Sequence, residues 1–72
     1  SLNISYNAAA ASSVAVELYD MTGSKAVQQQ FNVNRGMNQL SVDGASRLSH
    51  GVYLVRIADL MTNEVTTSKI AK

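Results

Sequence analysis

Residues 14–27 read VAVELYDMTGSKAV. Branched apolar side chains occupy every second position from Val14 to Leu18, which is the period of a half-buried β-strand. Residues 20–24 then supply turn-forming side chains, and Gly23 stands where a left-handed residue closes a type I turn with a bulge. The alternation resumes at residues 25–31. This pattern predicts a β-hairpin.

The same period of two recurs on both sides of the hairpin, separated by polar turn segments. The predicted strands are residues 2–6, 14–19, 25–31, 37–42, 51–57 and 64–71. Residues 51–57 are apolar on both faces, which is typical of a central strand. The glutamines within residues 25–31 leave that strand a weak inner face, so we expect it at a sheet edge.

The connections between these strands contain turn signals but no convincing helix. Residues 7–13 hold an alanine run without a cap or an apolar stripe, which predicts a loop. Residues 43–50 predict a crossing connection with a short helical turn, held against the core by Leu48. Asn63 tolerates the left-handed conformation that the last hairpin needs.

These features together predict an all-β fold, a small immunoglobulin-like β-sandwich of six to seven antiparallel strands. The 72 residues are too few for a multi-domain enzyme, and we expect residues 1–72 to form a single domain. The chain has no cysteine and no tryptophan, so it lacks the Cys, Trp, Cys framework of antibody domains.

Charge and composition also exclude several classes of function. Six basic and five acidic residues are interleaved along the chain, which disfavours nucleic-acid binding through a basic face. No apolar run approaches the length of a membrane span, so we expect no membrane insertion. His50 is the single histidine, and the nearest carboxylates in the sequence, Asp43 and Asp59, are too few for a zinc site. Ser46 and Ser49 lie at spacings that match no nucleophile elbow. We therefore predict no catalysis, no metal site and no cofactor.

Three segments, in order, carry a family resemblance. The first is the strand that ends in Tyr19 and Asp20, followed after two residues by Gly23. The second is LSHGVYLVRI at residues 48–57, and the third is the basic and aliphatic finish TSKIAK at residues 67–72. Their order and spacing resemble the C-terminal sorting domains of the type IX secretion system (the Por secretion system, type A family) of certain Gram-negative bacteria.

This resemblance implies a secretion signal that itself catalyses nothing. Such domains follow a parent cargo domain, cross the periplasm in transit, and are recognised as folded sandwiches by the outer-membrane translocon. A sortase-like peptidase then removes the domain, and the cargo reaches the outer-membrane surface or is secreted. Family members often carry a proline-containing segment ahead of the first strand. This chain has no proline, so we expect that segment and the cleavage site upstream of Ser1.

Carried over position by position, the resemblance assigns a signal motif and a turn glycine. The motif residues are Leu48, Gly51, Tyr53, Lys69, Ile70 and Lys72, and the turn glycine is Gly23. Two of these positions are explained equally well without a signalling role: Gly51 as a turn residue and Tyr53 as a core residue. We expect the translocon to recognise the edge of residues 65–72 by strand addition. Exposed edges also predict a strand-swapped homodimer at high concentration.

One alternative remains open at the level of sequence. The same pattern is found in generic immunoglobulin-like spacers and in carbohydrate- or surface-binding modules of extracellular proteins. Glycan binding and an internal position in the parent protein would distinguish that alternative from a sorting signal.

Overall fold

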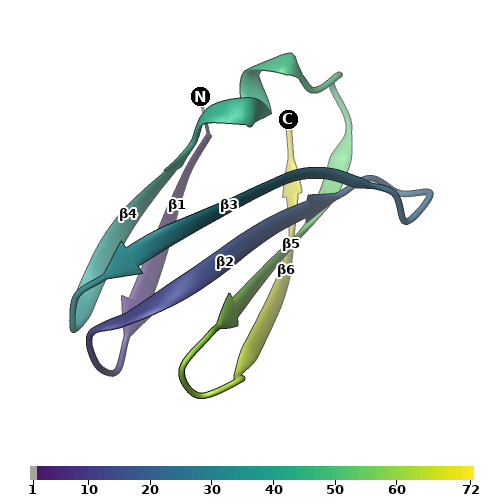
Figure 1. Cartoon of the computed structure of the whole chain (residues 1–72). Coiled ribbons are helices and arrows are strands. Elements are labelled where there is room, and N and C mark those ends of the chain that lie inside the picture. The colour runs from purple at the N-terminus through teal and green to yellow at the C-terminus, as the bar shows by residue number, and fades with distance from the viewer. Residues whose placement is uncertain (1) are drawn as a thin grey trace.

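A computed structural model describes residues 2–72 and contains strands with one short 3-10 helix (Figure 1). The elements in chain order are β1 (Leu2–Ala8), β2 (Ser12–Tyr19), β3 (Lys25–Val33), β4 (Gly36–Val42), η1 (Asp43–Arg47), β5 (Val52–Asp59) and β6 (Val65–Ala71). The predicted central hairpin is present as β2 and β3, and the predicted last strand as β6.

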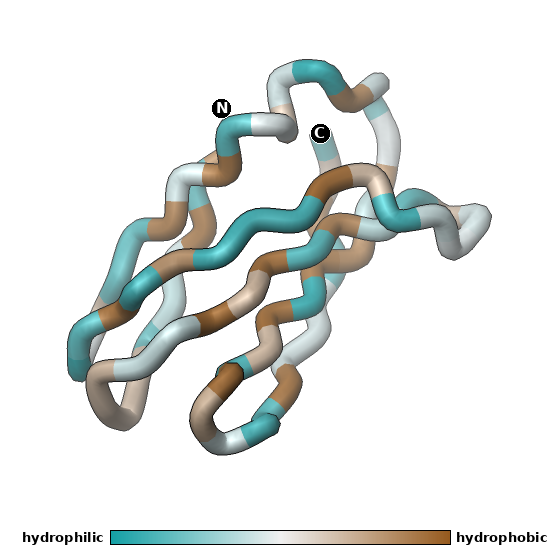
Figure 2. Tube along the Cα trace, viewed as in Figure 1, coloured by the Kyte–Doolittle hydropathy of each residue, from teal (hydrophilic) through white to brown (hydrophobic). Residues whose placement is uncertain are grey.

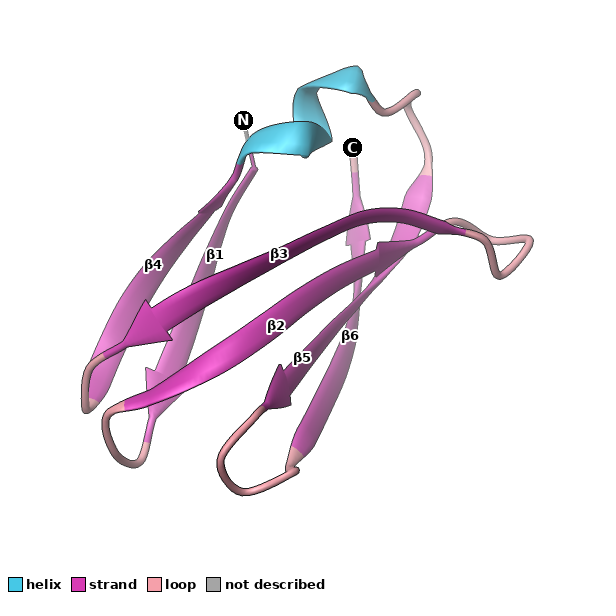
Figure 3. Cartoon of the chain, viewed as in Figure 1, coloured by secondary structure: helices cyan, strands magenta, loops and turns pink. Residues whose placement is uncertain are grey.

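The strands form two antiparallel sheets of unequal width. One sheet has the order β1-β4, and the other has the order β3-β2-β5-β6. The chain changes sheet between β1 and β2, between β3 and β4, and again through η1, which is the helical element at one end of the molecule (Figure 3). The predicted all-β sandwich is confirmed, and β5 lies inside its sheet as expected.

The core lies between the two sheets and consists of residues that alternate along their strands, as expected for sheets with one buried face. Its fully buried side chains are Val14, Val16, Leu18, Val42 and Val55. Leu40 adds to this layer from β4, so the predicted inward direction of Leu40 and Val42 is confirmed. Tyr53 and Ile57 are also buried, on the same face of β5 as Val55.

Strand β3 lies at an edge of the larger sheet, as its glutamines predicted. A hydrophilic run follows its middle section, while the neighbouring strands show alternating apolar positions (Figure 2). The outward positions of β3 are exposed and its inward positions are only half-buried up to Phe31. An edge strand tolerates this composition because one of its sides faces water.

The structure corrects several predicted boundaries. The loop predicted at residues 7–13 is shorter, because β1 extends to Ala8 and β2 begins at Ser12. Ala8 is buried and continues the inward alternation of β1. Strand β3 continues to Val33, which is also buried. The connection after β4 contains the predicted helical turn, η1, and Leu48 packs against the core as predicted. Leu48 is only half-buried, however, and Ala45, which is 2% exposed, is the more deeply buried residue.

Two turns adopt the left-handed backbone that their sequences predicted. Gly23 has a φ of 90°, and its amide donates to the carbonyl oxygen of Asp20 at 3.0 Å. Asn63 has a φ of 66° in the β5–β6 hairpin, and its amide donates to the carbonyl oxygen of Asp59 at 2.8 Å. Both hairpins are therefore closed by residues suited to positive φ.

Candidate functional site

The residues around Gly51 hold the last residue of the chain. The amide of Gly51 donates to the carbonyl oxygen of Lys72 at 3.1 Å, and the amide of Lys72 donates to the carbonyl oxygen of Gly51 at 2.8 Å. The Lys72 ammonium donates to the carbonyl oxygen of Leu48. The Nδ1 atom of His50 lies 3.2 Å from the Lys72 carbonyl oxygen. The block that begins at Leu48 thus contacts both the backbone and the side chain of Lys72.

Tyr53 joins this arrangement from inside the sandwich. Its side chain is 7% exposed, and it faces Ile70 across the β5–β6 ladder. The Tyr53 hydroxyl donates to the carbonyl oxygen of Ser49 at 2.8 Å. A buried phenol needs such a partner, so this bond fixes the connection ahead of β5 against the ring.

A small apolar cavity of about 60 Å³ lies at the same end of the sandwich. Its lining residues are Leu2, Ala45, Ser46, Leu48, Tyr53, Ile70 and Lys72. Leu48, Tyr53, Ile70 and Lys72 belong to the motif assigned from the sequence. Residues from both ends of the domain therefore meet around one cavity, and Leu2 places the start of β1 there as well.

Two of the assigned residues lie elsewhere. Lys69 is exposed and faces Leu54 on the outer side of the larger sheet. Gly23 lies in the β2–β3 turn, where Asp20 organises the loop: its Oδ1 atom accepts from the amides of Thr22 and Ser24 at 2.9 and 3.0 Å. The structure thus gathers Leu48, Gly51, Tyr53, Ile70 and Lys72, and separates Lys69 and Gly23 from them. The signalling role of all these residues stays a prediction.

Strand β6 forms an edge of the larger sheet, and its hydrogen-bond register can be followed from Lys72. Gly51 and Lys72 exchange both backbone bonds, so the next pair along the ladder is non-hydrogen-bonded and the two types then alternate. The residues of β6 whose backbone groups point away from β5 are accordingly Val65, Thr67, Lys69 and Ala71. This row of amides and carbonyls is available for strand addition.

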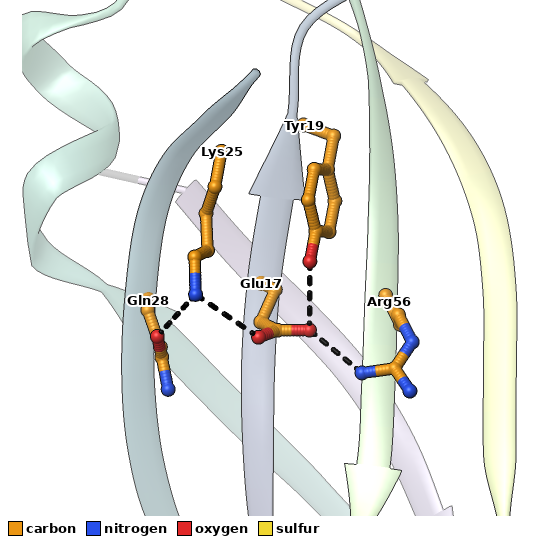
Figure 4. A network of polar contacts seen from close by, with 5 residues as sticks. All are labelled: Glu17, Tyr19, Lys25, Gln28 and Arg56. Atoms are coloured by element: carbon orange, nitrogen blue, oxygen red, sulfur yellow. Dashed lines mark hydrogen bonds and ion pairs between the residues drawn. The ribbon is translucent and has the colours of Figure 1, made fainter. Parts of the chain in front are cut away.

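A polar network on the outer face of the larger sheet was not predicted from the sequence (Figure 4). Glu17 Oε1 accepts from Arg56 Nη1 at 2.7 Å and from the Tyr19 hydroxyl at 3.2 Å. Its Oε2 atom lies 3.5 Å from Lys25 Nζ, which also donates to Gln28. The Glu17 side chain is only 11% exposed.

The contacts of Glu17 define its charge state. The hydrogen bond from Arg56 lowers the pKa of Glu17 below its ordinary value of 4.5, and Tyr19 and Lys25 act in the same direction. Burial opposes this shift. Glu17 and Arg56 are direct partners across β2 and β5, although they are 39 positions apart in the sequence. The sequence offered no signal for the pairing because it depends on strand register.

Within residues 2–72, no group of three or more His, Asp or Glu side chains is arranged to hold a metal ion. In the same part of the chain, no helix has the length and apolar character needed to cross a membrane. His50 is exposed, and its one polar contact is with the Lys72 backbone.

The geometry defines a small β-sandwich module in which Leu48, Gly51, Tyr53 and Ile70 lie around Lys72, at the end of an exposed edge strand. In a comparison with protein-family models, the secretion system C-terminal sorting domain matches residues 1–72. The chain therefore belongs to the family of type IX secretion C-terminal sorting domains. No curated protein and no solved structure matches the chain.

Membership of this family gives the general function. The domain is a C-terminal sorting signal for type IX secretion, so it interacts with that machinery and directs export to the cell surface or the medium. The family is a class of secretion signals and is not itself catalytic. The outer membrane of a Gram-negative bacterium is the setting in which such a signal acts.

Proposed function

We propose that the type IX translocon recognises this domain in its folded state, through the free edge of β6. The domain would pass through the periplasm attached to an upstream cargo domain, and a sortase-like peptidase would remove it after translocation. The observation that carries the proposal is the contact between Lys72 and the block from Leu48 to Gly51.

That contact links the recognised strand to the folded state. Strand β6 contributes a single half-buried side chain, Ile70, to the core, and its other side chains are exposed. A strand with so little core contact would fray in isolation, because burial is what stabilises an edge strand. The bonds from Gly51, Leu48 and His50 to Lys72 hold its end in place. Recognition of β6 as an ordered edge therefore depends on the motif residues around Gly51.

The exposed face of β6 has a composition suited to reversible recognition. The residues with free backbone groups alternate between apolar, hydroxyl and basic side chains, ending with Lys69 and Ala71. A strand from the translocon would take affinity from the backbone bonds and specificity from these side chains. The exposed backbone groups of β6 are also the basis for the strand-swapped homodimer that we expect at high protein concentration.

A transport assay tests the proposed function. Residues 1–72 are fused through a flexible linker to a fluorescent reporter that carries a periplasmic signal peptide, in a bacterium with an active type IX system. We expect delivery of the reporter to the surface or the medium, and loss of delivery in a translocon mutant. Retention in the periplasm in both strains, also after restoring the segment upstream of Ser1, would contradict the proposal.

A further inference from the structure

The smaller sheet leaves one side of the sandwich uncovered. Leu40 and Val42 of β4 are buried, but their partners Ile4 and Leu2 on β1 are only half-buried. On the opposite sheet, Thr66 and Ser68 share the inward face of β6 and are exposed. The inward-facing residues of β1 and β6 thus border an open flank, formed by Leu2, Ile4, Tyr6, Thr66, Ser68 and Ile70.

Hollows lie at both ends of this open flank. The apolar cavity of about 60 Å³ includes Leu2 from β1 and Ile70 from β6. A larger groove of about 370 Å³ at the other end includes Tyr6 from β1 and Thr66 from β6. Both hollows are therefore bordered by residues of the same two strands, β1 and β6.

Along the open flank, the edge of β1 that faces away from β4 has no partner strand within residues 2–72. All seven residues of β1 pair with β4, and the described chain places no strand on the other side of β1. The smaller sheet therefore has room for a third strand at the free edge of β1. Such a strand would lie over the inward face of β6, where Thr66 and Ser68 now face water.

The charges along the flank are uneven. Asp59 and Glu64 line the larger groove, and no lysine or arginine is among its lining residues. Asp59 is engaged in the hairpin, since its Oδ1 atom accepts from the Ser12 hydroxyl and the Met61 amide. The Glu64 carboxylate has no hydrogen-bond or ion-pair partner within residues 2–72. The cavity at the opposite end, beside Leu2, is lined mostly by apolar side chains, and the charged residue in its lining is Lys72.

We propose that the open flank binds an extended segment of a partner protein, which pairs with the free edge of β1 as a third strand of the smaller sheet. Antiparallel pairing is the more stable arrangement and brings the start of the segment to the groove at Glu64. Alternate side chains point inward. The segment therefore carries a lysine or arginine opposite Tyr6 and an aliphatic side chain four residues later, at the cavity beside Leu2.

This inference does not rest on the proposed role of β6. It concerns a different strand, β1, and a different sheet, and it holds for any partner with the stated pattern. Complementary charge at Glu64 sets the direction of the segment, and the cavity selects the size of its aliphatic side chain.

The test uses the peptide TKTVTLT, whose length matches β1 and whose lysine and leucine are four residues apart. Amide chemical shifts and hydrogen exchange of the whole domain are followed during titration. We expect shift changes at residues 2–8 and on the inward face of β6, and slower exchange of β1 amides. Glu64→Lys should weaken binding by about tenfold at low salt through like-charge repulsion. Asp43→Lys, the same charge change at an exposed site outside the groove, should leave it unaltered.

A second measurement uses a covalently linked segment, which loses less conformational entropy on binding than a free peptide does. The first six residues of the peptide, TKTVTL, are joined ahead of Leu2 through a two-residue Asn-Gly turn, which raises their local concentration at the edge of β1. In this hairpin register the leucine pairs with Leu2 and the lysine with Tyr6. We expect a higher Tm than for a version in which the lysine and leucine are replaced by glutamate and serine. Equal Tm values, together with no binding at about 1 mM free peptide, would overturn the proposal. Shift changes confined to the outer edge of β6, or a dimer of this chain closed across β1 in sedimentation, would overturn it as well.

Discussion

Gly51 and Lys72 form a reciprocal backbone pair, with N···O distances of 3.1 and 2.8 Å. The pair closes the β5–β6 ladder at the end where the chain enters β5. It also sets the register that turns the backbone groups of Thr67 and Lys69 outward. The pair therefore identifies the residues of β6 whose backbone groups a partner strand can reach.

Tyr53→Phe removes the hydroxyl that donates to Ser49 and leaves the buried ring in place. We expect the free energy of unfolding to fall by about 1 kcal/mol, the net value of a typical hydrogen bond. Urea denaturation measures the change. Tyr6→Phe is the matched control, because the Tyr6 hydroxyl has no hydrogen-bond partner within residues 2–72, and its effect should stay within about 0.5 kcal/mol. Equal losses for both variants would show that the Ser49 bond contributes nothing.

The lowered pKa of Glu17 predicts how the free energy of unfolding changes with pH. The pKa of Glu17 is lowered in the folded state, chiefly by Arg56. The ionised carboxylate therefore stabilises the fold fully above the ordinary pKa of 4.5, and this stabilisation is lost as the pH falls through the lower folded pKa. We expect the free energy of unfolding to decline below about pH 4.5. In Glu17→Gln the decline should be shallower. It should not vanish, because the pKa values of Asp20 and Asp59 are also lowered, first by the hydroxyls of Thr22 and Ser12. An unchanged pH profile in Glu17→Gln would refute this account of the network.

Gly23→Ala tests the backbone of the β2–β3 turn. An added Cβ would meet no heavy atom within 4 Å, so any loss of stability comes from the φ of 90°. We expect a loss of about 1–2 kcal/mol in thermal or urea unfolding. Gly23→Asn should cost less, because asparagine tolerates the left-handed region. A larger loss for asparagine than for alanine would indicate that a contact, and not the backbone angle, selects glycine.

The fold could be predicted where alternation involves large side chains. Branched residues from Val14 to Leu18 and the apolar stretch around Val55 identify β2 and β5. Two of the errors fall on alanine, whose small side chain gives little hydropathy contrast in either direction. Ala8 and Ala45 are buried, yet one was predicted in a loop and the other was overlooked in favour of Leu48.

The candidate site was predicted only in part, for a related reason. The resemblance supplied Leu48, Gly51, Tyr53, Ile70 and Lys72 as separate motif positions. Four of them line one cavity and Gly51 bonds to Lys72, an arrangement that requires the β5–β6 register. The contact between Glu17 and Arg56 depends in the same way on the pairing of β2 with β5. The local hydropathy pattern predicts where the strands lie, whereas the contacts between side chains of different strands depend on long-range strand register.

The central claim is that the translocon recognises the free edge of folded β6, and Thr67→Pro tests it most directly. The Thr67 amide points away from β5, so proline there blocks strand addition without removing a β5–β6 bond. Ser68→Pro, which does remove such a bond, is the control for loss of folding. In the reporter fusion, we predict that Thr67→Pro keeps the cooperative unfolding transition of the domain and abolishes export. Export at the level of the unaltered domain would contradict the claim.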